Sequence, residues 1–200
     1  MLNFNLPTTL TLIRLVLSPI ILPLLFVYLL PFNNVVINAL LGLLFIAFSL
    51  TDFFDGYLAR KYRQETALGS ILDPIADKFL VYSVLIGLAV VHKIYFFWVI
   101  IFIGREFFMM GLRQIALEHN FSVPVSMIGK FKTAFQMICL AVIIVNPYQS
   151  LAFGLHGKEL FNTIELITLG LALGFTVASG YLYYRSFMIQ FAKIHLGKGK

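Results

Sequence analysis

Residues 52–77 read DFFDGYLARKYRQETALGSILDPIAD and contain every aspartate of the chain, with long apolar runs on both sides. An ionised aspartate within a membrane costs roughly 3 kcal/mol even on the most lenient insertion scale. Such residues are therefore rare in apolar segments unless they have a function. Four of them in one short stretch indicate a functional site, and the rest of the chain is interpreted around it.

The spacing of the aspartates suggests how they act together. Asp52 and Asp55 are three residues apart, and Asp73 and Asp77 are four residues apart. If the first pair ends one helix and the second pair begins the next, each pair shares one helical face. Four clustered carboxylates need cations, and oxygen ligands favour Mg²⁺ or Mn²⁺ over zinc, so two divalent cations are expected. Pro74 is expected in the first turn of the second helix. The alternative is that these residues are loop acids and helix caps, with Asp73 as the N-cap.

The stretch resembles a known signature, D-x-x-D-G-x-x-A-R, then eight residues, then G-x-x-x-D-x-x-x-D. Its fixed positions are matched by Asp52, Asp55, Gly56, Ala59, Arg60, Gly69, Asp73 and Asp77. This is the signature of the CDP-alcohol phosphotransferases. The resemblance implies a membrane enzyme of six helices in which the four aspartates hold two divalent cations against the diphosphate of a CDP-linked lipid. It also implies that Asp77 is the general base and that CDP-diacylglycerol is bound by Asp52, Gly56, Ala59, Arg60 and Gly69.

The composition independently indicates an integral membrane protein. Of 200 residues, 60% are hydrophobic and only 12% are charged. This is too apolar for a soluble domain of the same size. The net charge of +6 could suggest nucleic acid, but the basic residues lie beside apolar segments, where anionic lipid headgroups are the nearer partner. The single cysteine, Cys139, lies in an apolar run and is interpreted as a small core residue.

Hydropathy predicts an all-α membrane protein in which residues 1–200 form a single domain. A short interfacial segment at residues 2–6 precedes six transmembrane helices, expected at about 8–30, 35–58, 71–91, 95–118, 128–145 and 160–185. Six spans place both termini on one side. Lys93 and Lys158 are the only lysines or arginines expected on the opposite side. The positive-inside rule therefore predicts that the termini and the aspartates face the cytoplasm from the inner membrane.

A second group of charged residues lies in residues 104–114 and 128–137. Arg105 and Arg113 fall on one broad helical face about 12 Å apart, and Lys130 and Lys132 open the next helix on the same membrane side. These four cations are expected to bind a phosphate on the acceptor, which a neutral alcohol would not need. The alternative is that Arg113, Lys130 and Lys132 are topological anchors and that Arg105 pairs with Glu106 or another carboxylate.

Both segments also resemble the phosphatidylglycerophosphate synthases within the family, and with the N-terminal match this resemblance covers about the first 140 residues. It implies that the acceptor is sn-glycerol 3-phosphate and that the products are phosphatidylglycerophosphate and CMP. It also implies a homodimer, for which Gly170 and Gly174 supply a G-x-x-x-G pattern.

Two rival functions remain at this stage. A cardiolipin synthase of the CDP-alcohol type would use phosphatidylglycerol as the acceptor, and a divalent-cation transporter would also place carboxylates in the membrane. A transporter usually has its site near the midplane on broken helices, and it has no need of Arg60.

Overall fold

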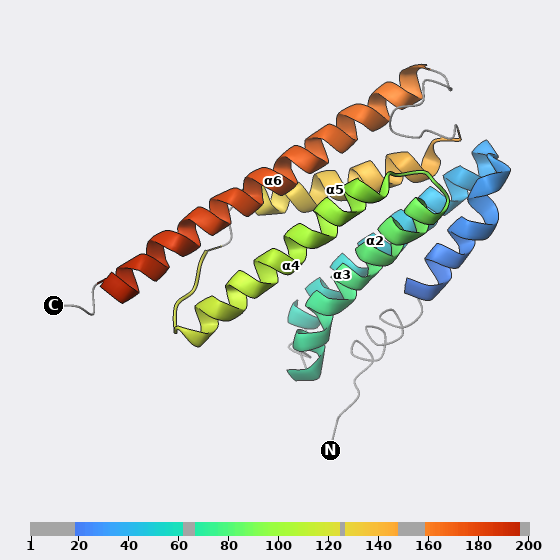
Figure 1. Cartoon of the computed structure of the whole chain (residues 1–200). Coiled ribbons are helices and arrows are strands. Elements are labelled where there is room, and N and C mark those ends of the chain that lie inside the picture. The colour runs from blue at the N-terminus through green and yellow to red at the C-terminus, as the bar shows by residue number, and fades with distance from the viewer. Residues whose placement is uncertain (1–18, 62–66, 125–126, 148–158, 197–200) are drawn as a thin grey trace. The chain divides into compact units, whose positions relative to one another are not determined.

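The computed structural model describes the backbone of residues 19–61, 67–124, 127–147 and 159–196, and every regular element in these ranges is helical (Figure 1). Side chains are described for residues 19–50, 78–124, 127–147 and 160–194. The interfacial segment expected at residues 2–6 and the start of the first expected helix lie outside these ranges. The prediction of an all-α chain is confirmed for the described part.

The helices follow one another along the chain and group into two compact units. A helix at residues 19–29 runs into a 3-10 turn, η1 (Leu30–Phe32). The longer helices are α2 (Val35–Lys61), α3 (Ala67–Val90), α4 (Phe96–Glu118), α5 (Met127–Val145) and α6 (Glu159–Leu196). The first unit holds the helices up to α3 together with the end of α5, and the second holds α4, the start of α5 and nearly all of α6. The single domain expected from hydropathy stays a prediction.

Helix α2 begins at a conventional polar cap. The side-chain oxygen of Asn34 accepts hydrogen bonds from the backbone N–H groups of Val36 and Ile37, at 2.9 and 3.4 Å. An asparagine at the N-cap satisfies donors that have no partner within the helix. The preceding Asn33 adopts a left-handed conformation with φ of 50° and ends η1.

Helices α3 and α4 end in the same way, with one residue in the left-handed region. His92 has φ of 57°, and the next N–H, of Lys93, donates to the carbonyl of Leu88 at 2.9 Å. Asn120 also has φ of 57°, and the N–H of Phe121 donates to the carbonyl of Ala116 at 3.0 Å. This bonding pattern satisfies carbonyl groups that the end of a helix leaves unpaired.

The first unit is packed through glycines at two close approaches. A Cβ added to Gly87 in α3 would lie 3.1 Å from the backbone of Pro23 in the helix at residues 19–29. A Cβ added to Gly42 in α2 would lie 2.4 Å from the Cγ2 of Val145, at the end of α5. Phe26 and Phe45 are both fully buried in this unit. A side chain would therefore crowd a neighbour at both positions, and more severely at Gly42 than at Gly87.

The second unit contains an apolar cluster formed by the ends of α4 and α6. It is made up of Leu112, Ala116, Val123, Tyr183 and Phe187, with Met109, Phe121 and Phe191 packed against it. The rings of Phe187 and Phe191 stack with centroids 5.6 Å apart, and the ring of Phe121 lies 5.4 Å from that of Phe187. We call this set the aromatic cluster.

The aromatic cluster explains why α6 is longer than expected. The helix is expected to end near residue 185, before a basic tail, but it continues to Leu196. Tyr183, Phe187 and Phe191 recur every four residues, and packing of this face extends the helix. Its 38 residues correspond to about 57 Å, well beyond a hydrocarbon core of about 30 Å.

The described helices have the apolar surfaces expected in a membrane. Two of them, Met127–Val145 and Leu160–Ile194, are long and apolar enough to cross a bilayer, and three shorter apolar helices are found at Pro19–Phe32, Val35–Leu50 and Lys78–Val90. Large apolar side chains such as Leu40, Ile100 and Leu166 are exposed. Surfaces of this kind are unusual on soluble monomers and normal against lipid.

Candidate active site

All four aspartates of the signature lie in the interior of helices. Asp52 and Asp55 fall within α2, which ends at Lys61, and Asp73 and Asp77 fall within α3, which begins at Ala67. Their side chains, like those of Gly56, Ala59, Arg60 and Gly69, lie outside the described residues. The helix bounds nevertheless count against the interpretation of these acids as caps or loop residues, because caps lie at helix ends.

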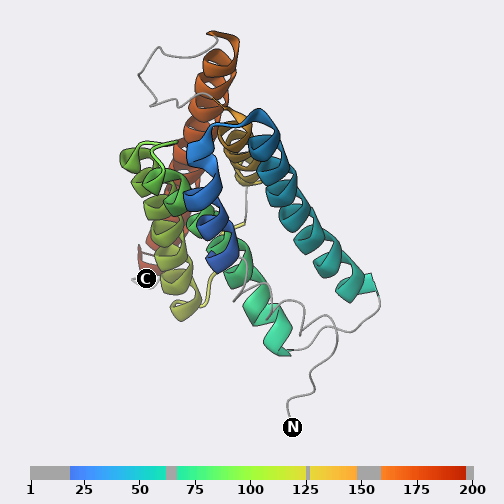
Figure 2. The ribbon, with the colours of Figure 1, turned by 90° about the vertical axis from the view of Figure 1, so that its right-hand side faces the viewer.

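The aspartates stand at matching positions on either side of the connection between α2 and α3. Asp55 is six residues from the end of α2 (55 to 61), and Asp73 is six residues from the start of α3 (67 to 73). Asp52 is nine residues from the same end of α2 (52 to 61), and Asp77 is ten from the start of α3 (67 to 77). The two helices contact each other and run in opposite directions (Figure 2). The four positions therefore lie at similar distances along the sequence from the connection between the two helices.

The start of α3 corrects the expected place of Pro74. The helix was expected to begin near residue 71, with Pro74 in its first turn, but it begins at Ala67 and continues through the proline. A proline inside a helix leaves the carbonyl four residues earlier without its usual N–H donor. Helices in membranes tolerate this where other groups satisfy the freed carbonyl. Asp73 is consequently not an N-cap.

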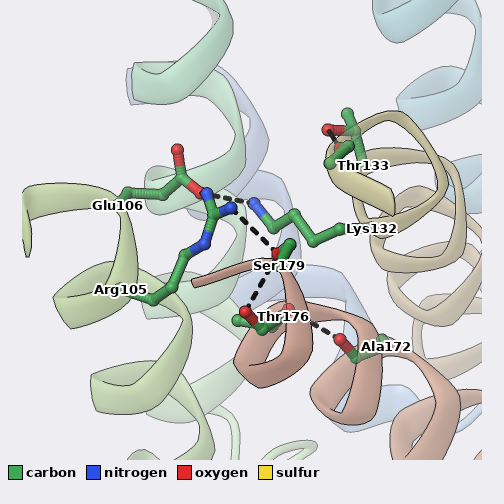
Figure 3. Close-up of polar contacts among 8 residues, drawn as sticks. Arg105, Glu106, Lys132, Thr133, Ala172, Thr176 and Ser179 are labelled. Carbon is green, nitrogen blue, oxygen red and sulfur yellow. Dashed lines mark hydrogen bonds and ion pairs between the residues drawn. The ribbon is translucent and has the colours of Figure 1, made fainter. Parts of the chain in front are cut away.

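The second unit contains a buried group of charged side chains from two helices. The guanidinium of Arg105 in α4 pairs through Nη1 with Oε1 of its neighbour Glu106. The ammonium of Lys132 in α5 lies 2.6 Å from the same oxygen (Figure 3). The side chains of Arg105, Glu106 and Lys132 are only 15%, 13% and 7% exposed. One carboxylate oxygen therefore holds two cations together in a largely apolar region.

Helix α6 adds a hydroxyl group to these charges. Nη2 of Arg105 donates a hydrogen bond to Oγ of Ser179 at 2.9 Å (Figure 3). A Cβ added to the next residue, Gly180, would lie 3.4 Å from the Cγ of Arg105, so the backbone of α6 runs close to the arginine stem. We call Arg105, Glu106, Lys132 and Ser179 the cationic cluster.

The structure distinguishes the four cations that were expected to bind one phosphate. Arg105 and Lys132 meet at Glu106, whereas Arg113 and Lys130 are exposed. The Arg105–Glu106 pairing is the one that the alternative interpretation named. Sequence reasoning missed Ser179, because a serine in an apolar helix belongs to no motif and only the fold brings it to Arg105.

The remaining described residues contain no group of three histidine, cysteine, aspartate or glutamate side chains able to hold a metal ion. Cys139 is buried and free, in agreement with its interpretation as a core residue. Carboxylates are the oxygen ligands that Mg²⁺ and Mn²⁺ prefer, and the binding of such cations by the four aspartates stays a prediction.

These features define a helical membrane protein with acidic residues inside two consecutive apolar helices. A model of the CDP-alcohol phosphatidyltransferase family matches residues 4–178. The chain belongs to this family and is an enzyme of the phosphatidyltransferase class. Members of the family generally depend on a divalent metal.

Several bacterial proteins of one name resemble the chain over most of its length. A CDP-diacylglycerol–glycerol-3-phosphate 3-phosphatidyltransferase of Rickettsia typhi is 37% identical, over 91% of this chain and 96% of the relative. Proteins of the same name from Bacillus subtilis and Salmonella choleraesuis are 35% and 37% identical, over 90% and 84% of this chain and 94% and 90% of the relatives. The resemblance therefore extends beyond the first 140 residues to which sequence reasoning confined it, and it includes much of α6.

Proposed function

We propose that the chain transfers the phosphatidyl group of CDP-diacylglycerol to sn-glycerol 3-phosphate, giving phosphatidylglycerophosphate and CMP. The proposal rests on one observation: the side chains of Arg105 and Lys132 lie together in one buried cluster, where both pair with Glu106. Two cations held in an apolar region suit an acceptor that carries its own phosphate. The names of the relatives from Rickettsia typhi and Bacillus subtilis support the same acceptor.

The signature residues serve the lipid nucleotide in this proposal. Asp52, Asp55, Asp73 and Asp77 hold two divalent cations, Mg²⁺ or Mn²⁺. When bound, these cations supply charge neutralisation at the diphosphate and at the departing CMP. Gly56, Ala59 and Gly69 leave room for the nucleotide, and Arg60 binds a phosphate oxygen.

Asp77 is assigned the role of general base, which accepts the proton of the acceptor hydroxyl. A carboxylate beside divalent cations is a weak base, because their positive charge favours its ionised form. Its effectiveness therefore depends on a short hydrogen bond to the hydroxyl and on late proton loss. The hydroxyl oxygen attacks the β-phosphorus, which carries the diacylglycerol, and the bond from this phosphorus to the oxygen bridging it to CMP breaks. Arg105 and Lys132 hold the acceptor through its own phosphate.

Glu106 has a specific part in this arrangement. Two cations without a counter-ion would repel each other and would be costly to keep out of water. Through one oxygen Glu106 binds both groups, which keeps them charged and close together. We assign it the role of a fixed counter-ion rather than of a substrate ligand.

We place the protein in the inner membrane with six spans. The support is the apolar surface of the described helices and the distribution of lysine and arginine. In this topology both termini and the aspartates face the cytoplasm, where the nucleotide-activated lipid and the acceptor are available.

We also propose a homodimer that uses α6. Among the described residues, no atom lies within 4 Å of a Cβ added to Gly170 or Gly174. This G-x-x-x-G face is therefore not occupied by another described helix, and it suits close packing against a second copy. Native mass spectrometry from membranes tests this proposal. The Gly174→Leu variant is expected to be monomeric. A monomeric mass for the active wild-type protein would contradict the proposal.

A single assay separates the candidate reactions. Membranes containing the protein are incubated with CDP-diacylglycerol, Mg²⁺ and one acceptor at a time, and the release of CMP is followed. Release with sn-glycerol 3-phosphate supports the proposal, whereas release with phosphatidylglycerol alone would identify a cardiolipin synthase. The transporter alternative is not retained, because the chain belongs to a family of transferases.

A further inference from the structure

The guanidinium of Arg105 is held at two of its three nitrogens by two different helices. Nη1 pairs with Glu106 in α4, and Nη2 donates to Ser179 in α6. The third nitrogen, Nε, is buried and has no hydrogen-bond acceptor among the described residues. A buried N–H without a partner is costly, and such groups often point to a ligand that is not present.

Ser179 is itself oriented to accept a hydrogen bond. Its hydroxyl donates to the backbone carbonyl of Thr176, one turn earlier in α6, at 3.0 Å. A hydroxyl has one donor and two acceptor positions, so this bond directs an oxygen lone pair towards Arg105. Ser179 is 1% exposed, and the bond therefore forms where water does not compete.

The hydrogen bond from Nη2 of Arg105 to Ser179 is important because the guanidinium group is planar. A guanidinium bound at one nitrogen can still rotate, whereas one bound at both Nη1 and Nη2 has a fixed plane. The direction of the Nε–H group is then also fixed. Arginine binds phosphate best when two of its N–H groups are aligned with two phosphate oxygens, so a fixed plane favours this ligand.

We propose that Ser179 is a positioning residue of the acceptor-phosphate site, fixing the plane of Arg105 so that its Nε–H is presented to the phosphate of the acceptor alcohol. This inference rests on the proposed function, because it concerns the site assigned there to Arg105. It gives α6 a part in substrate binding. The ligand class is an alcohol bearing a phosphate monoester, and Ser179 acts on it only through Arg105.

The first test compares three variants at positions of α6. Ser179→Ala removes the hydroxyl, and we expect the KM for glycerol 3-phosphate to rise about tenfold, the equivalent of one hydrogen bond to a charged group. The KM for CDP-diacylglycerol and kcat should not change. Ser179→Thr keeps a hydroxyl and should retain most of the affinity. Thr176→Val is the matched control, since the hydroxyl of Thr176 donates to the carbonyl of Ala172 in its own helix.

A general structural role would give a different pattern. If Ser179→Ala lowered kcat and raised both KM values together, or if Thr176→Val had the same effect, Ser179 would serve packing and the inference would be overturned.

A double-mutant cycle tests whether Ser179 affects acceptor binding only through Arg105. This test does not depend on how well Ser179→Thr folds. Arg105→Gln should raise the KM for glycerol 3-phosphate, and adding Ser179→Ala should raise it no further. Additive effects would overturn the inference. If Arg105→Gln raises this KM but Ser179→Ala does not, the positioning role fails and the acceptor site survives. If Arg105→Gln leaves it unchanged, the acceptor site itself fails.

Discussion

The ammonium group of Lys93 donates a hydrogen bond to the backbone carbonyl of Asn146, the residue that follows the end of α5. The side chain of Asn38 in α2 donates to the same carbonyl at 3.1 Å. Lys93, Asn38 and Asn146 are all buried. A cation at the C-terminal end of a helix is favourable, because the unpaired carbonyls there carry partial negative charge. Lys93 thus joins the turn between α3 and α4 to the end of α5.

Replacing Lys93 should therefore destabilise the first unit. Lys93→Met keeps the long side chain but removes the donor, and the expected loss in the free energy of unfolding is about 1–3 kcal/mol. The midpoint of thermal unfolding in detergent measures it. The matched control is Lys130→Met, at an exposed position of α5. Equal midpoints for the two variants would show that the Lys93 bond adds nothing to stability.

Gly42 should tolerate no side chain unless Val145 is made smaller. The Cβ of Gly42→Ala would lie 2.4 Å from the Cγ2 of Val145, and a β-branched side chain in a helix has little freedom to move away. We expect a lower unfolding midpoint for Gly42→Ala and a recovery in the double variant Gly42→Ala/Val145→Ala. Gly111→Ala is the control, because no described atom lies within 4 Å of its added Cβ. Failure of the second change to rescue the first would contradict this contact.

The aromatic cluster should stabilise the end of α6. Phe187 is 5% exposed, and truncation of a buried phenylalanine typically costs about 3–5 kcal/mol. Phe187→Ala should lower the unfolding midpoint and expose the C-terminal part of α6 to proteolysis. Met188→Ala, at the neighbouring exposed position, should do neither. If the two variants are cut equally fast, this part of α6 does not depend on the cluster.

The helices of this chain could be predicted from sequence where hydropathy alone decides their ends. The end of α6 could not be, because Tyr183, Phe187 and Phe191 extend it by packing against α4, and hydropathy does not record that contact. The start of α3 was placed too late because a proline is expected near a helix start, whereas Pro74 lies inside the helix.

The candidate site could also be predicted only in part: the aspartates could be identified from the sequence, whereas the cationic cluster could not. The aspartates belong to a dense motif, and their residue types and spacing suffice to single them out. The cationic cluster joins residues 105, 132 and 179, which are far apart in the sequence. A sequence can show that Arg105 is unusual in an apolar segment, but only the fold shows that Glu106 and Ser179 fix its guanidinium.

Removal of one signature carboxylate should abolish the reaction without unfolding the protein. Asp73→Asn and Asp52→Asn each remove a charge from the proposed metal site, and CMP release should fall by at least about a hundredfold. Chelation of divalent metal with EDTA should have the same effect on the wild type and be reversed by Mg²⁺. Glu118→Gln is the matched change at an exposed position of α4 and should retain activity. Near-normal turnover of either aspartate variant at ordinary Mg²⁺ levels would refute the metal assignment.

Buried and exposed cations should differ in their effect on the acceptor. Lys132→Gln removes a charge from the cationic cluster, and the KM for glycerol 3-phosphate should rise about tenfold to a hundredfold, since a charge-assisted contact to phosphate is worth about 1.5–3 kcal/mol. Lys130→Gln, two residues earlier in α5, and Arg113→Gln in α4 change exposed side chains and should leave that KM within about twofold. Arg60→Gln should raise the KM for CDP-diacylglycerol instead, because Arg60 belongs to the aspartate signature. Steady-state CMP release with each substrate varied in turn gives all of these values. If Lys132→Gln, Lys130→Gln and Arg113→Gln raise the KM for glycerol 3-phosphate equally, the positive charge of this region attracts the acceptor only in a general way. The buried cluster would then not be its binding site.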